Sequence, residues 1–161
     1  MDKKYYDLEK ISYACTIVEY IVRMKFLQRA EVVKELGKNN IKSLCEDFYV
    51  WHFSSYESTA EDFANDSNIR CGMYDFIERS KRKPLNPRIL GKMWANLAIY
   101  IANKKNIDII DAIYDVFSNS NIEQELENST DLSMFEDPRY VQRIYKEGNF
   151  DYLSRLLINY R

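Results

Sequence analysis

The stretch LEKISYACTIVEYIVRMK, residues 8–25, decides the fold class. Apolar side chains recur in it at steps of three and four residues, namely at Leu8, Ile11, Ala14, Cys15, Val18, Ile21 and Val22. That spacing places them along one side of an α-helix, where they can pack against a protein core. The stretch therefore predicts a long amphipathic helix.

The same period continues through most of the chain. It predicts helices over residues 28–36, 41–48, 88–103 and 150–160, and further helices from capping residues near 59, 108, 120 and 137. The chain has only 4 glycines and 3 prolines, too few for many strands joined by tight turns. A composition of 46% hydrophobic and 30% charged residues suits amphipathic helices better than disorder. We therefore expect an all-α fold of about eight helices.

The segment SKRKPLNP, residues 80–87, is the clearest break in this pattern. Pro84 disfavours helix at the residue before it, and Asn86 with Pro87 fits the cap and first position of a new helix. The break predicts an N-terminal helical half at 1–80, a basic Pro-containing linker at 81–87 and a C-terminal helical half at 88–161. Residues 20–27 also match residues 100–107 faintly, as a diverged duplication of one half would.

Acidic residues gather in the second half. Between Lys105 and Arg139 there are nine Asp or Glu residues and no Lys, Arg or His. The preceding stretch, residues 70–105, holds nine Lys or Arg residues against two acidic ones. Charges segregated in this way indicate surfaces that meet charged partners or each other. The chain's 13 tyrosines add contact area of the kind common where proteins bind proteins. The candidate partner-binding residues are Asp111, Tyr114, Asp115, Phe117, Glu123 and Glu127.

The basic stretch at residues 79–92 offers an alternative function. Cations in a loop that leads into a helix N-terminus can hold phosphate groups, as in a nucleic-acid-binding regulator. The candidate phosphate contacts are Arg79, Lys81, Arg82, Lys83, Arg88 and Lys92. The net charge of −2 weighs against this alternative, because nucleic-acid binding usually needs a dominant basic face.

Residue types that carry chemistry are scarce. His52 is the only histidine, in the strand-like run YVWHF at 49–53, which we interpret as a buried extended connection with a hydrogen-bonded histidine in a turn. A Cys45–His52 nucleophilic pair would need an activated thiol, but Cys45 sits in a run typical of a buried helix face. The three cysteines form no CxxC pair, and no metal-ligand spacing occurs. We therefore expect a non-enzymatic cytoplasmic protein without cofactor, leader segment or membrane span.

Three short motifs in the first half are IVEY at 17–20, AEVVKEL at 30–36 and YVWH at 49–52. In the second half stand YIA at 100–102, DA at 111–112, TDL at 130–132 and YV at 140–141. Together they resemble small uncharacterised bacterial helical domain families often encoded beside predicted ADP-ribosyltransferase toxins. Trp51 and Phe53 depart from the family pattern, which has Leu and Thr there. The resemblance implies an antitoxin-like or regulatory protein that binds a toxin enzyme.

Overall fold

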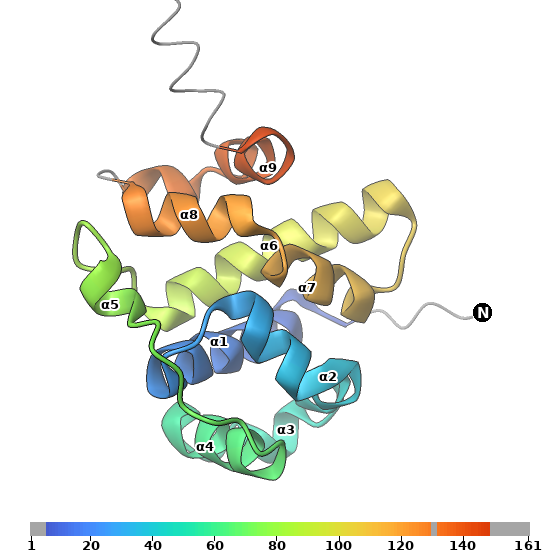
Figure 1. Ribbon diagram of the computed structural model, residues 1–161. Coiled ribbons are helices and arrows are strands. Elements are labelled where there is room, and N and C mark those ends of the chain that lie inside the picture. Colours follow the sequence, from blue (N-terminus) through green and yellow to red (C-terminus); the bar gives the residue numbers. More distant parts are fainter. Residues whose placement is uncertain (1–5, 130–131, 149–161) are drawn as a thin grey trace, which may run out of the picture.

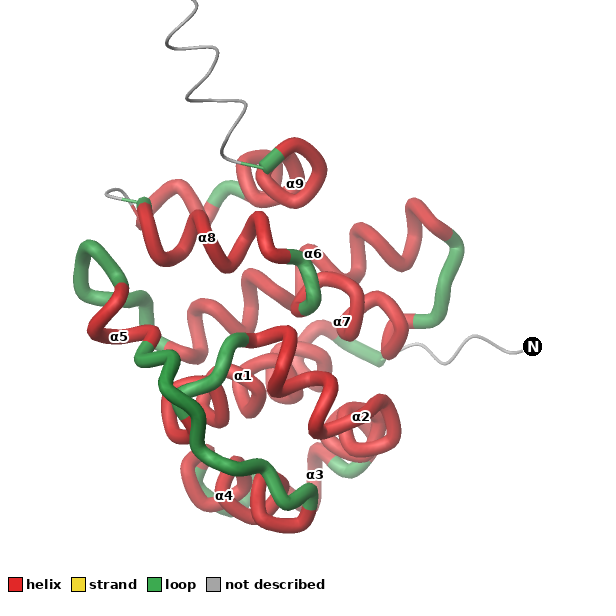
Figure 2. Tube along the Cα trace, viewed as in Figure 1, coloured by secondary structure: helices red, strands yellow, loops and turns green. Residues whose placement is uncertain are grey.

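The computed structural model describes residues 6–129 and 132–148, and within them every regular element is helical. Figure 1 labels the α-helices, and Figure 2 shows that the segments between them are loops. The all-α prediction is confirmed. The predicted helix at 150–160 lies outside the described residues. In order the elements are α1 Leu8–Lys25, α2 Arg29–Glu46, α3 Phe48–Trp51, α4 Tyr56–Asp66, α5 Phe76–Arg79, α6 Pro87–Lys105, α7 Ile109–Phe117, α8 Ser120–Asn128, the 3-10 helix η1 Leu132–Glu136, and α9 Pro138–Glu147.

Side-chain caps explain where the helices begin. The Asn86 and Asp137 side chains accept hydrogen bonds from first-turn N–H groups of α6 and α9, and a proline follows each cap, as the sequence predicts. Two caps lie slightly upstream of the predicted ones. Ser55 caps α4, and Asn119, not Ser120, caps α8. The predicted starts of α4 and α8 are therefore correct to within a few residues, whereas the predicted start at 41 falls inside α2, which is kinked at Gly37.

The run at residues 49–53 is not a buried extended connection, and that prediction is wrong. Trp51 N–H donates to the Asp47 carbonyl at 3.1 Å, and His52 N–H donates to the Phe48 carbonyl at 2.9 Å, which closes a helical turn. No strand among the described residues could pair with an extended segment here, so the backbone satisfies its hydrogen bonds locally. Only Phe48 of this turn is buried.

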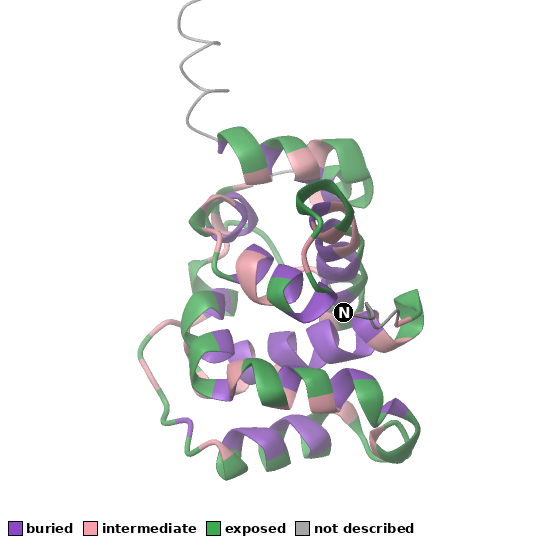
Figure 3. Cartoon of the chain, turned by 90° about the vertical axis from the view of Figure 1, so that its right-hand side faces the viewer, coloured by how far each residue is buried: buried purple, intermediate pink, exposed green. Residues whose placement is uncertain are grey.

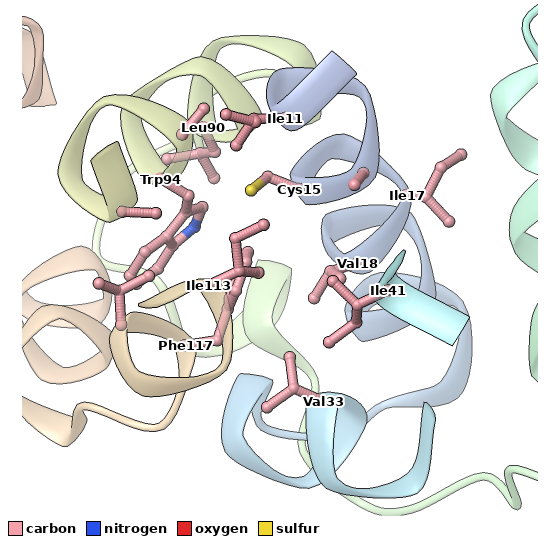
Figure 4. Close-up of a cluster of buried hydrophobic side chains, with 14 of the residues drawn as sticks. Ile11, Cys15, Ile17, Val18, Val33, Ile41, Leu90, Trp94, Ile113 and Phe117 are labelled. Atoms are coloured by element: carbon pink, nitrogen blue, oxygen red, sulfur yellow. The ribbon is translucent and has the colours of Figure 1, made fainter. Parts of the chain in front are cut away.

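α1 and α6 form the centre of the molecule, one helix from each predicted half. Gly91 allows their close approach, because a Cβ there would lie 2.1 Å from Thr16 Oγ1 and 2.9 Å from Thr16 N. Figure 4 shows Ile11 and Cys15 of α1 near Leu90 of α6 in one cluster of buried side chains. Figure 3 shows the buried residues along the inner faces of the helices. The two predicted halves thus share one hydrophobic core.

The α1–α2 and α6–α7 corners have the same geometry at an offset of 80 residues. Phe26 and Asn106 end α1 and α6, each with a left-handed backbone at φ 54°. The next N–H, of Leu27 or Ile107, donates to the carbonyl five residues earlier, at 3.4 Å and 3.1 Å respectively. These are the residues that match in the sequence. The common corner supports the predicted duplication, which stays a prediction.

Candidate functional site

A buried ion-pair network occupies the centre of the core. Arg29, with 0% of its side chain exposed, donates from Nε to Glu19 Oε1 at 2.6 Å and from Nη1 to Glu123 Oε2. Trp94 Nε1 also donates to Glu19 Oε1, at 2.6 Å. The guanidinium lies 4.1 Å from the ring centre of Phe76. Five helices, α1, α2, α5, α6 and α8, therefore meet around one cation.

This network removes Glu123 from the candidate partner-binding residues. Burial alone would lower the pKa of Arg29, but the carboxylates of Glu123 and Glu19 outweigh burial and raise the pKa above its ordinary value. Glu123 is 8% exposed because the buried guanidinium needs both carboxylates as counter-ions. A Glu123→Lys reversal would place a second cation beside Arg29, so it would disrupt the core and not a partner contact.

Phe117 is also a core residue, and its assignment to a partner surface is wrong. The side chain is 1% exposed and lies against Trp94, with ring centres 4.5 Å apart. α7 turns Phe117 inward together with its aliphatic residues, because they share the helix face packed against α6. Tyr114, on the same helix, is half-buried with Lys38 Nζ 5.3 Å from its ring centre.

The other acidic candidates pair with cations of the same chain. Asp111 pairs with Lys38 at 2.8 Å, and Glu127 pairs with Arg79 at 2.7 Å. Asp115 pairs with Lys105 at 3.2 Å and also accepts a hydrogen bond from the Tyr145 hydroxyl. The Arg79–Glu127 and Lys105–Asp115 pairs join the basic stretch at residues 70–105 to the acidic stretch that follows it. The structure thus favours the interpretation that the two charged stretches meet each other. The acidic candidate residues are therefore largely neutralised within the chain.

The basic candidates separate into two places. Arg79 is paired, and the exposed Lys81, Arg82 and Lys83 lie in the loop between α5 and α6. Arg88 and Lys92 follow on α6, four residues apart and therefore on one face of that helix. Both line a surface hollow.

We call this open surface cavity the α3 hollow. Its volume is about 450 Å³, within the range of small ligand sites. Its walls come from α1, α3, the α3–α4 connection, α4 and α6. The lining residues are Glu9, Ser12, Tyr13, Thr16, Phe48, His52, Ser54, Ser55, Tyr56, Arg88 and Lys92.

Aromatic rings continue from the hollow to the outer surface. The Phe48 ring centre lies 5.0 Å from His52 and 5.4 Å from Tyr49. His52 in turn lies 4.3 Å from Phe53. Tyr49, Val50 and Phe53, which we call the α3 rim, are 64%, 64% and 84% exposed. These residues belong to the YVWHF run, whose exposure the sequence did not predict. Residues of its β-branched and aromatic types are more often buried than exposed.

The two cations that line the hollow, Arg88 and Lys92, have no ion-pair partner in the described part of the chain. Within residues 6–129 and 132–148, no carboxylate forms an ion pair with Arg88 or Lys92. The Arg88 guanidinium lies 5.4 Å from the ring centre of Tyr56, which stacks on Tyr20 at 5.6 Å. Glu9 is the acidic lining residue, so two full positive charges face one negative charge. The hollow can therefore attract a single anionic group.

Neither the Cys45–His52 pair nor a metal centre has geometric support among the described residues. Burial, followed by the nearby Glu46 carboxylate, raises the pKa of Cys45 to about 12, so its thiol stays protonated near neutral pH. His52 is exposed at the end of α3, whereas Cys45 is fully buried. No three His, Cys, Asp or Glu side chains of residues 6–129 and 132–148 gather in a way that could hold a metal ion.

None of the helices between residues 6 and 148 combines the length and the apolar character that crossing a bilayer requires. Comparisons with known proteins add no functional assignment to these sites. No protein-family model matches the chain, and neither a curated protein nor a solved structure matches it significantly.

Proposed function

We propose that this chain is a non-enzymatic module that binds another protein through the α3 rim and the α3 hollow. The observation that carries the proposal is the rim itself. Three large hydrophobic side chains are exposed on one short helix and its connection, and the rings of Tyr49 and Phe53 both lie against the His52 ring. Clustered exposed hydrophobic surface commonly marks a protein interaction site. Tyrosine and phenylalanine are among the residues enriched at the centres of such interfaces.

A narrower form of the proposal names the partner as a bacterial toxin enzyme. It rests on the resemblance to helical domain families encoded beside predicted ADP-ribosyltransferase toxins. In this form the module acts in the cytoplasm and neutralises or regulates the enzyme. The three free cysteines support a reducing place of action. Because the acidic face is internally paired, the α3 rim replaces it as the contact surface.

A nucleic-acid-binding regulator has less support. Arg79 is engaged with Glu127, and Lys81 to Lys83 lie apart in sequence from the pair on α6 that lines the hollow. Phosphate-backbone binding usually uses many cations on one face. We expect no salt-dependent binding of nucleic acid by this chain at physiological ionic strength.

The test is a capture experiment with a matched control. The rim variant replaces all three α3 rim residues with Ser, and the control variant carries Met73→Ser, Ile77→Ser and Met134→Ser, which are also exposed apolar positions. Each protein is used to capture proteins from nuclease-treated lysate of the native host, with quantitative mass spectrometry. The captured protein is then purified and its Kd measured against all three forms.

We expect a partner that the wild type and the control retain and the rim variant loses, with a Kd at least about tenfold weaker for the rim variant. Equal capture by the rim variant would remove the rim as a binding surface. Capture from untreated lysate that disappears after nuclease treatment would favour the nucleic-acid alternative.

A further inference from the structure

We infer that the α3 hollow receives an acidic side chain of the partner protein, from a segment that places an apolar side chain on the α3 rim. This inference rests on the proposed function and names the chemistry that the partner must offer. It assigns Arg88 and Lys92 as the residues that bind the carboxylate, and Tyr49 with Phe53 as the residues that contact the apolar neighbour.

Charge complementarity supports an acidic occupant. Arg88 and Lys92 lie one turn apart on α6 and both line the hollow, and neither forms an ion pair with a carboxylate of the described residues. Among the other basic candidates, Arg79 is paired with Glu127, whereas Lys81, Arg82 and Lys83 lie in an exposed loop. Arg88 and Lys92 differ from these loop cations because they line a hollow. A carboxylate in their reach can accept charge-assisted hydrogen bonds, which are stronger than neutral ones.

Further donors surround these cations. The α4 N-terminus begins at the hollow, since Ser54, the capping residue Ser55 and the first helical residue Tyr56 all line it. The positive end of the helix dipole also favours an anion there. Arg88 is held over the Tyr56 ring at 5.4 Å, which limits the freedom of the guanidinium before any partner arrives.

Glu9 limits what can enter. With one carboxylate facing two cations, the lining has a net excess of one positive charge. One acidic side chain neutralises that excess, whereas a polyanionic backbone would bring several charges against Glu9. The chain's net charge of −2 adds to this discrimination. The hollow therefore favours an acidic protein segment over a nucleic acid.

The adjoining rings determine the neighbour of the acidic residue. Phe48 and His52 line the hollow, and they contact Tyr49 and Phe53 of the rim. A segment that runs from the hollow along this aromatic surface can bury an aliphatic or aromatic side chain favourably. The recognised segment is thus an acidic residue next to a large apolar one.

Selection from short random peptides displayed on phage tests this inference with the full chain. We expect enrichment of sequences in which Asp or Glu adjoins a large apolar residue. An enriched peptide, labelled with a fluorophore, is then titrated by anisotropy against the wild type and two variants. The hollow variant is Arg88→Gln/Lys92→Gln. The matched control is Arg82→Gln/Lys83→Gln, which removes the same two charge types from the exposed loop.

The hollow variant should weaken binding at least about tenfold, the effect of losing one charge-assisted hydrogen bond, while the control stays within about twofold. A peptide with Gln in place of its acidic residue should bind the wild-type protein more weakly by a similar factor. Circular dichroism establishes that both variants stay folded.

Enrichment of neutral or basic peptides, no enrichment at all, or equal loss in both variants would overturn the inference. Binding of a short oligothymidine that weakens in the hollow variant would assign the cations to nucleic acid instead. Failure here is distinguishable from failure of the proposed function. If the lysate partner needs the α3 rim but binds the hollow variant normally, protein binding stands and only the acidic contact is wrong.

Discussion

Replacement of Arg29 by Leu should remove a large part of the protein's stability. The side chain is fully buried, and its loss leaves two carboxylates, Glu19 at 0% and Glu123 at 8% exposure, without their shared cation. Breaking a buried ion pair by removing one partner costs about 3–5 kcal/mol, because the remaining charge is left uncompensated. Domains of this kind are stable by about 5–15 kcal/mol, so the variant loses roughly a fifth of that or more.

Urea unfolding followed by far-UV circular dichroism measures this effect, with the midpoint concentration and the slope both reported. Lys38→Ala is the matched control, since it breaks an exposed ion pair with Asp111 and should cost about 0–1 kcal/mol. The triple variant Glu19→Gln/Arg29→Leu/Glu123→Leu should be more stable than Arg29→Leu alone. It removes the buried charges and keeps an acceptor for the Trp94 indole N–H.

Two outcomes would refute this reasoning. One is a loss for Arg29→Leu no larger than that for Lys38→Ala, which would mean that water reaches the carboxylates. The other is a triple variant that is less stable than the single variant, which would mean that the two carboxylates stabilise the fold through other contacts, such as the hydrogen bond that Glu123 accepts from the residue 29 backbone N–H.

Four further predictions concern packing, backbone conformation and the thiols. Gly91→Ala should lower the melting temperature, because overpacking against α1 costs about 1–3 kcal/mol and the gain in helix propensity is at most about 1 kcal/mol. An unchanged melting temperature would mean that α1 and α6 can move apart with little loss of free energy. Phe26→Asn, which copies Asn106 of the matching corner, should raise stability in urea by about 0.5–1 kcal/mol, since Asn tolerates the left-handed backbone better. A lower stability would show that the packing of the Phe26 ring stabilises the fold by more than the backbone strain destabilises it. In the native protein a thiol reagent should modify exposed Cys71 quickly and the two buried thiols only after unfolding, and modification of all three at one rate would contradict their burial. Burial raises the pKa of Cys45 from 9.0 to about 12. Between these pH values the Cys45 thiol has lost its proton in the unfolded chain and keeps it in the folded chain. The stability measured in urea should therefore fall as pH rises through this range.

Local features of the fold could be predicted because their causes are local. The helical period of residues 8–25 and the Asn86–Pro87 and Asp137–Pro138 starts depend on neighbours within a few residues, and all three were correct. The run at 49–53 was misjudged because its composition is strand-like, whereas its backbone closes a helical turn when no strand is present to pair with it.

The candidate site depended on contacts that composition does not reveal. Glu123 was placed on an acidic surface because its neighbours in sequence are acidic, yet its counter-ion is Arg29, 94 residues earlier. Arg88 and Lys92 were singled out as candidate phosphate contacts, in a set with four other cations that do not line the α3 hollow. The hollow itself requires α1, α4 and α6 to meet, and no single segment of sequence carries that arrangement.

The Arg29 network also constrains how the chain can fold while it is being synthesised. Arg29 leaves the ribosome when α6 and Glu123 have not yet been made, so its second counter-ion arrives 94 residues later. At about 5–20 residues per second, that interval is roughly 5 to 20 seconds. During it, α1 lacks the helix that covers its central face, and a guanidinium destined for the core has one carboxylate partner in place of two. The first half must therefore stay hydrated and open until α8 emerges, and the nascent chain should gain protease resistance in one late step and not progressively.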